Sequence, residues 1–120
     1  MQLFGIPNCS TVKKARDWLS SNGVAYDFHD FKKNGVNHDL LNAWLKQMPW
    51  EKLVNRAGMT WRNLTEEEKS AVTDASSALV LMLEKSSVIK RPVLVKDGKI
   101  VCLGFSEAAY KELLWQTQAL

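Results

Sequence analysis

Residues 3–28 read LFGIPNCSTVKKARDWLSSNGVAYDF, and their hydrophobic pattern changes twice. A short apolar run ends before Pro7, as a first strand does, and from Ser10 apolar residues recur at helical spacing until Gly23. The apolar pattern of residues 24–28 then predicts a second strand. A strand, a helix and a strand in so short a segment predict a β-α-β unit with parallel strands and a right-handed crossover.

Helical signals fill the middle of the chain. Asn37 is a candidate N-cap, and a capping-box pattern with acidic residues in the first turn begins at Thr65. Thr73 or Asp74 can open a further apolar helix. We expect these helices to form an insertion over about residues 37–87.

The strand pattern returns after Pro92. Two apolar runs flank a turn that contains Asp97 and Gly98, which is a hairpin signal, and Ser106 can cap a last helix. The order is therefore β-α-β, a helical insertion, and β-β-α. We predict an α/β fold in which residues 1–120 form a single domain with a thioredoxin-like, mixed four-stranded sheet.

Composition restricts the class of function. The 120 residues are 46% hydrophobic and 24% charged, the balance of a soluble globular protein and not of a disordered one. A net charge of +3 favours anions but falls short of the basic stripe of a nucleic-acid binder. No window approaches the roughly 18 apolar residues of a membrane span, and the N-terminus lacks the basic start of a signal peptide. We expect a cytoplasmic protein with neither nucleic acid nor membrane as partner.

Cys9 is the candidate nucleophile. It follows the first strand and precedes the first helix, where backbone N–H groups stabilise a thiolate and lower the pKa of a cysteine. Ser10, Thr11 and Lys13 of the first helical turn are candidates for binding an anion beside the sulfur. The alternative is a buried, inert structural cysteine.

The second cysteine, Cys102, lies far from Cys9 in the sequence. Cys9 to Val12 do not form a C-x-x-C pair, so regeneration of the thiol needs an external thiol. Cys102 could act only if its Cα came within about 7 Å of that of Cys9, and its place in a strand favours core packing. Two distant cysteines also favour a reducing compartment.

Arg91-Pro92 opens the third strand, and a proline there can follow a cis peptide bond. Pro92 is therefore a candidate structural residue. Arg91 would face the Cys9 loop, where its planar fork could hold an oxyanion or a carboxylate. The alternative for Arg91 is an ordinary surface charge. His29 and His38 lack partners at metal-ligand spacing, so we expect no metal site.

Motifs spread over nearly the whole chain form a specific combination. They are Gly5-Ile6-Pro7-Asn8-Cys9-Ser10-Thr11, Lys13-Lys14-Ala15, Phe28-His29-Asp30-Phe31, Asn55-Arg56-Ala57-Gly58-Met59-Thr60-Trp61-Arg62, Lys90-Arg91-Pro92 and Leu103-Gly104-Phe105-Ser106. With these motifs the sequence resembles the arsenate reductase (ArsC) family, which has a thioredoxin-like fold, and most of all its YffB and Spx branch. The resemblance implies that Cys9 is the nucleophile and that Arg91 is the arginine before the cis-proline.

Three positions depart from the arsenate reductase pattern. The second arginine of those enzymes falls on Asn55, with Arg56 adjacent, and the third falls near Leu103. The histidine four residues before the cysteine is replaced by Gly5. Because an oxyanion needs several positively charged donors, we expect weaker arsenate binding with the thiol chemistry intact.

The resemblance implies a glutathione-dependent thiol reductase that acts on a small oxyanion or a mixed disulfide. Glutathione is then a co-substrate and not a bound cofactor, and glutathione or a glutaredoxin is the partner that regenerates the thiol. One alternative is an arsenate reductase proper. Others are an Spx-like redox-responsive regulator that binds the RNA polymerase alpha subunit, and a binding module without turnover.

Overall fold

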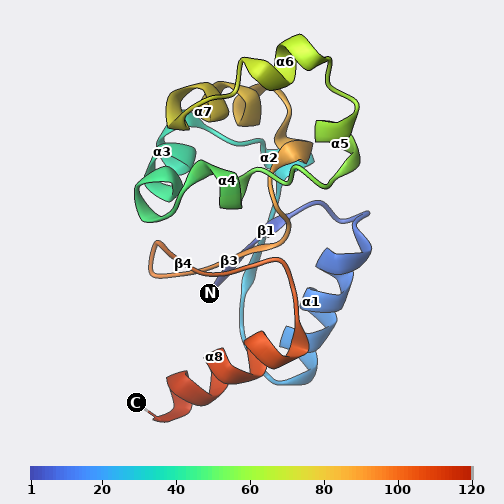
Figure 1. Ribbon diagram of the computed structural model, residues 1–120. Coiled ribbons are helices and arrows are strands. Elements are labelled where there is room, and N and C mark those ends of the chain that lie inside the picture. Colours follow the sequence, from blue (N-terminus) through green and yellow to red (C-terminus); the bar gives the residue numbers. More distant parts are fainter. Residues whose placement is uncertain (120) are drawn as a thin grey trace. The chain divides into compact units, whose positions relative to one another are not determined.

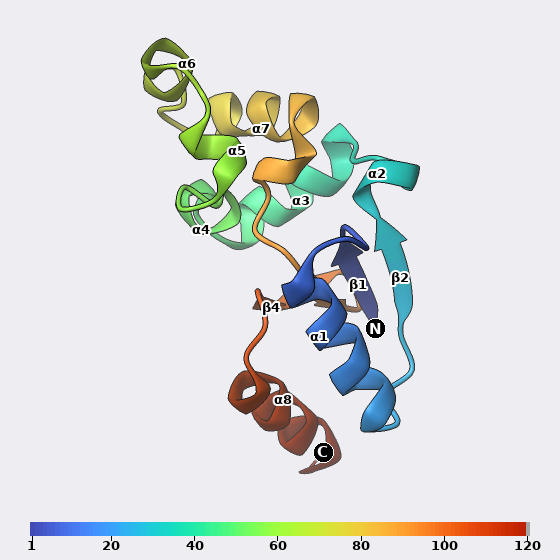
Figure 2. The same ribbon diagram turned by 90° about the vertical axis from the view of Figure 1, so that its right-hand side faces the viewer.

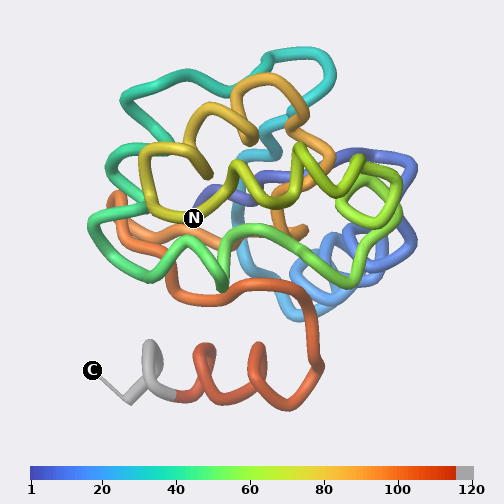
Figure 3. Tube along the Cα trace, turned by 45° about the horizontal axis from the view of Figure 1, so that its top comes forward, coloured from blue at the N-terminus to red at the C-terminus, as the bar shows by residue number. Residues whose placement is uncertain are grey.

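The computed structural model describes residues 1–119. The chain divides into two compact units, of which the first comprises Met1–Asp30 with Arg91–Leu120 and the second comprises Phe31–Lys90. The second unit is inserted between two segments of the first, and the path of the chain can be followed in Figure 3. It contains the insertion expected at about residues 37–87, while the single domain stays a prediction.

The first unit is built on a four-stranded sheet. Its elements are β1 (Gln2–Gly5), α1 (Ser10–Ser21), β2 (Asp27–Asp30), β3 (Val93–Lys96), β4 (Lys99–Leu103) and α8 (Glu107–Ala119). The strand order is β2-β1-β3-β4, with β1 and β2 parallel and the other two pairs antiparallel. Figure 1 labels β1, β3 and β4, and Figure 2 labels β2 beside β1. This topology confirms the predicted α/β fold with a thioredoxin-like, mixed sheet.

One face of this sheet carries the core of the unit. Leu3 of β1 is the register partner of Leu94 of β3, and both are buried together with Ala15 and Leu19 of α1. Tyr110 of α8 belongs to the same buried cluster. The apolar stripe of α1 and the α8 helix therefore cover the same face of the sheet (Figure 2).

The second strand begins later than the apolar pattern of residues 24–28 predicts. The N–H of Asp27 donates to the Met1 carbonyl at 2.9 Å, and the first residue pair in register is Gln2 with Asp27. A strand needs a neighbour, so β2 cannot start before β1 offers one. Val24 instead packs against the core cluster from the loop.

The predicted hairpin joins β3 and β4. Its two turn residues have positive backbone angles, with φ of 52° at Asp97 and 79° at Gly98. This geometry matches a type I′ turn, whose twist suits two antiparallel strands and which an Asp-Gly pair favours. The Asp-Gly signal therefore correctly marks the position of the turn.

The second unit is helical. Its elements are α2 (Phe31–Asn34), α3 (His38–Gln47), α4 (Trp50–Leu53), α5 (Met59–Arg62), α6 (Glu66–Ser70), α7 (Ala75–Glu84) and a 3₁₀ turn, η1 (Ser86–Val88). Its two ends meet where Lys32 Nζ donates to Ser87 Oγ at 3.0 Å. The Lys90 N–H donates to the Leu53 carbonyl at 2.7 Å, and the Asn55 N–H donates to the Val88 carbonyl at 2.8 Å. These two hydrogen bonds join the end of the unit to the segment that follows α4.

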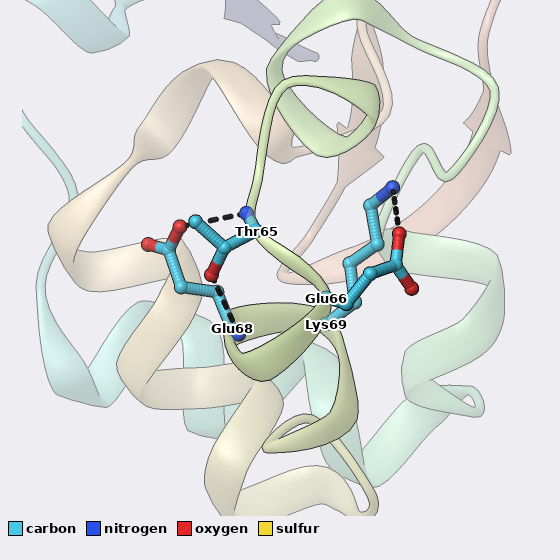
Figure 4. Close-up of polar contacts among 4 residues, drawn as sticks. All are labelled: Thr65, Glu66, Glu68 and Lys69. Atoms are coloured by element: carbon cyan, nitrogen blue, oxygen red, sulfur yellow. Dashed lines mark hydrogen bonds and ion pairs between the residues drawn. The ribbon is translucent and has the colours of Figure 1, made fainter.

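Side-chain caps begin these helices where the sequence predicts them. Asn37 accepts a hydrogen bond from the Leu40 N–H at 2.8 Å, and Asp74 caps α7. At α6 the Thr65 hydroxyl accepts from the Glu68 N–H at 3.1 Å, while the Glu68 carboxylate accepts from the Thr65 N–H at 2.9 Å (Figure 4). This capping box satisfies two N–H groups that a helix start leaves open.

Candidate active site

A tight turn carries Cys9 from β1 into α1. The N–H of Cys9 donates to the Ile6 carbonyl at 3.2 Å, and the Cys9 carbonyl accepts the first helical bond, from Lys13, at 3.0 Å. Cys9 itself has extended backbone angles, φ −91° and ψ 124°, and is the N-cap residue of α1. Its half-buried sulfur therefore lies at the open N–H groups of the helix, as the sequence predicts.

Gly5 allows this turn to pack closely. A Cβ at Gly5 would lie 2.8 Å from Cγ2 of Val12, a fully buried residue of α1. The end of β1 therefore approaches α1 more closely than a side chain allows. This packing gives a physical reason for Gly5 at the position where the resemblance would place a histidine.

The electrostatic surroundings of Cys9 favour the thiolate. Partial burial, the largest single influence, raises the pKa of the thiol, whereas hydrogen bonds from the backbone N–H groups of Val12 and Thr11 lower it. The Arg91 side chain lowers it further, through a hydrogen bond and through its positive charge. Together these contributions outweigh burial, and the pKa of Cys9 lies below its ordinary value.

Arg91 reaches Cys9 from the neighbouring strand. The Arg91–Pro92 peptide bond is cis and directly precedes β3, which pairs with β1 in the sheet. Pro92 is buried, and its carbonyl accepts a hydrogen bond from the Gly104 N–H at 2.8 Å. The sheet thus brings together two residues that are distant in the sequence, Cys9 and Arg91.

Cys102 has the opposite environment. Cys102 lies in β4 and is the register partner of Leu94 in β3. It is half-buried and packs against the core cluster. Burial raises the pKa of its thiol. Both cysteines are free thiols. The structural role predicted for Cys102 fits this place in the sheet.

The other candidate anion-binding residues fall into two groups. Ser10, Thr11 and Lys13 form the first turn of α1, with Ser10 and Lys13 exposed and Thr11 half-buried. Asn55 and Arg56 belong to the helical unit, in the segment between α4 and α5. Anion binding by these five residues stays a prediction.

The sequence did not single out Arg16, which the periodicity places on the apolar stripe of α1. The structure shows it half-buried, with Nε donating to the Tyr26 hydroxyl at 3.3 Å and its guanidinium carbon 4.1 Å from the Phe28 ring centre. An open groove beside it is lined by Lys13, Arg16, Asp17, Ser20 and Tyr26. The seven-residue spacing from Cys9 to Arg16, two helical turns, is a signal that could have identified this face.

Neither a membrane-spanning helix nor a metal-binding cluster is found in residues 1–119. Within this part of the chain, no helix is long and apolar enough to cross a membrane. The same residues contain no group of three or more histidine, cysteine, aspartate or glutamate side chains that could hold a metal ion.

Known proteins are similar to this chain over almost its full length. Residues 4–113 match the model of the ArsC family. A solved YFFB protein is 45% identical, with a TM-score of 0.85, and the match covers 92% of this chain and 96% of that one. An ArsC-related protein from Brucella melitensis is 49% identical, with a TM-score of 0.77 and coverage of 94% and 92%.

The global transcriptional regulator Spx of Streptococcus agalactiae is a more distant relative, 28% identical over 93% of this chain and 81% of its own. The match to the family model covers the cysteine turn, the arginine before the cis-proline and the helical unit. With sequence and fold in agreement over this length, the chain belongs to the ArsC family.

Proposed function

We propose that the protein is a cytoplasmic, glutathione-dependent thiol reductase whose nucleophile is Cys9. The observation that carries this proposal is the lowered pKa of Cys9 at the start of α1, beside the Arg91 guanidinium. A thiolate is the reactive form of cysteine in disulfide exchange. A cysteine with only a structural role has no need of this arrangement.

The reaction proceeds in two exchanges. The Cys9 thiolate attacks the glutathione sulfur of a mixed disulfide, the old S–S bond breaks, and the substrate thiolate leaves and takes a proton from water. The thiolate of a second glutathione then attacks the bond between Cys9 and glutathione. This step releases the Cys9 thiolate and glutathione disulfide, so glutathione supplies both electrons.

Arg91 positions the anionic part of the substrate in this scheme. Its guanidinium already donates to the Cys9 sulfur, so a carboxylate or an oxyanion bound there lies next to the reacting atom. The N–H groups of Thr11 and Val12 stabilise the thiolate before the first exchange and again when the second exchange releases it. Catalysis then depends on charge stabilisation by fixed donors.

Arsenate reduction is the second candidate, because the chain belongs to the ArsC family. A mixed-disulfide substrate is favoured since Gly5, Asn55 and Leu103 stand where the resemblance would place a histidine and two arginines. An oxyanion depends on such charges for binding, whereas a glutathione adduct has a whole peptide to contact.

Steady-state kinetics with glutathione test the proposal. Reduction of a glutathionylated peptide and of arsenate are compared in the parent, in Cys9→Ser and in Cys102→Ser. We expect turnover of the peptide in the parent, none in Cys9→Ser, and retained turnover in the folded Cys102→Ser protein. Faster turnover of arsenate than of the peptide would favour the second candidate.

The Spx relative motivates a third candidate, a regulator that binds the RNA polymerase alpha subunit. This chain has Val12 where a C-x-x-C pair would have its second cysteine, so a redox switch within this motif is absent. A pull-down with the alpha subunit tests the idea. Capture of that subunit, without turnover of any disulfide, would support the regulator.

A further inference from the structure

A polar groove runs along α1, the helix that begins after Cys9. Its lining is Lys13, Arg16, Asp17, Ser20 and Tyr26. All five residues belong to the sheet unit that also holds Cys9. Nothing in the proposed exchange mechanism uses this groove.

The groove lies on the helix that Cys9 caps. Residues four, seven and eleven positions after Cys9 are Lys13, Arg16 and Ser20, and such spacings return to one side of an α-helix. At a rise of about 1.5 Å per residue, Lys13 and Arg16 lie roughly 6 and 10 Å along the axis from Cys9. An extended peptide covers that span in two to three residues, at about 3.3 Å each.

Arg16 is held in place for binding. Its Nε–H donates to the Tyr26 hydroxyl at 3.3 Å, and its guanidinium lies 4.1 Å from the Phe28 ring centre. These two contacts leave the N–H groups at the terminal nitrogens of Arg16 available for a planar, two-oxygen acceptor. A side chain already fixed by packing loses less entropy when it binds a ligand.

The charges of the groove select the ligand. Lys13 and Arg16 are positive and Asp17 is negative, which leaves one net positive charge for an anion. A carboxylate matches this single charge and the fork of Arg16.

We infer that this groove binds a carboxylate on the molecule that forms a disulfide with Cys9. The inference rests on the proposed thiol-exchange function and narrows its substrate class. The carboxylate belongs to an acidic side chain two to three residues from the substrate cysteine, or to glutathione itself. Whichever molecule carries the carboxylate, the Cys9 thiolate attacks its disulfide, a new S–S bond to Cys9 forms and the old S–S bond breaks. The departing thiolate is protonated by water.

Lys13 and Lys14 offer a matched pair of variants. Both are exposed, and both Lys→Gln changes remove one positive charge, but only Lys13 lines the groove. The substrates are two disulfide peptides that carry Glu or Gln three residues from the cysteine. Two further substrates, glutathione disulfide and its glycyl ethyl ester, test glutathione as the source of the carboxylate.

We measure the rate constant for transfer of each substrate to Cys9. In the parent, the acidic member of a pair should react about 3-fold faster than its neutral counterpart, as one partly exposed ion pair allows. Lys13→Gln should bring this ratio towards one, and Lys14→Gln should keep it. The pair that shows the effect identifies the source of the carboxylate.

Several results would overturn the inference. The first is a parent protein that transfers acidic and neutral substrates at equal rates in both pairs. The second is a Lys13→Gln variant that keeps the parent's preference for the acidic substrate. The third is a Lys14→Gln variant that loses this preference as much as Lys13→Gln does. Alkylation of Cys9 against pH checks that Lys13→Gln has not changed the thiol itself. If no disulfide transfers to Cys9 at all, the proposed function fails first, and the groove loses its substrate with it.

Discussion

At the scale of single residues, the two cysteines of the sheet unit have opposite pKa shifts. The pKa of Cys9 is lowered by hydrogen bonds from α1 and from Arg91 in spite of partial burial. The pKa of Cys102 is raised, because burial acts on it without such donors. Position in the fold, and not residue type, therefore decides which thiol has the lower pKa.

This contrast predicts the alkylation behaviour of the two thiols. The rate of iodoacetamide labelling against pH should place the pKa of Cys9 below the free-thiol value of about 8.5, and that of Cys102 above it. Arg91→Ala should raise the pKa of Cys9, because it removes one hydrogen bond and one positive charge. Mass spectrometry assigns each label to its cysteine. A Cys9 that titrates at the free-thiol value would contradict the activated nucleophile.

The geometry of Arg91 gives a second prediction. Arg91→Lys keeps the charge but loses the planar fork. It should therefore lose much of the substrate-binding free energy that Arg91→Ala loses, on the order of 1 to 3 kcal/mol. The loss should appear in substrate binding for the glutathionylated peptide. If Arg91→Lys shows parent kinetics, charge alone suffices and the fork has no role.

At the scale of elements, β1 and α1 are joined by a turn that leaves no space for a side chain at Gly5. Gly5→Ala should destabilise the protein by about 1 to 3 kcal/mol, since the new Cβ would lie 2.8 Å from Val12 Cγ2. Chemical denaturation measures this loss.

Gly23→Ala is the wrong control for this change, because Gly23 has a φ of +68° and its substitution strains the backbone. A better control is Gly5→Ala combined with Val12→Ala. The combined loss should be smaller than the sum of the two single losses, because the second change removes the clashing methyl groups. Simple additivity would contradict the steric explanation.

Local signals in the sequence were sufficient for most elements. Asn37 and Thr65 cap their helices through contacts a few residues away, and the Asp97-Gly98 turn is equally local. The start of β2 was wrong because pairing with β1 determines it. The sequence also predicts Cys9 and Arg91 as site residues, and their role stays a prediction. Their burial and mutual contact depend on strand order and could not be calculated from the sequence.

At the scale of the whole molecule, the sheet unit depends on one cluster that joins the sheet to α1 and α8. Tyr110 is 1% exposed at its centre, and its hydroxyl has no hydrogen-bond partner among the described residues. Burial raises the pKa of Tyr110 strongly, and the nearby Cys102 adds to the effect. The ring stabilises this core while the hydroxyl adds only a desolvation cost.

Tyr110→Phe should therefore leave the melting temperature unchanged or raise it by a few degrees, because it removes a buried polar atom and keeps the ring. Tyr26→Phe is the matched control. It removes a hydroxyl that accepts from Arg16, so it should lower stability slightly. Differential scanning calorimetry compares the two variants, and a clear loss in Tyr110→Phe would point to a hydrogen bond made through water.

The order of the elements along the chain also separates the groups that lower the pKa of Cys9. Cys9 follows β1, but Arg91 enters only with β3, after the ribosome has made the whole helical unit. A nascent chain that has folded β1, α1 and β2 thus holds Cys9 without the guanidinium that lowers its pKa. In that chain the pKa of Cys9 is set by burial and by the N–H groups of Thr11 and Val12, and it falls further when Arg91 is added with β3.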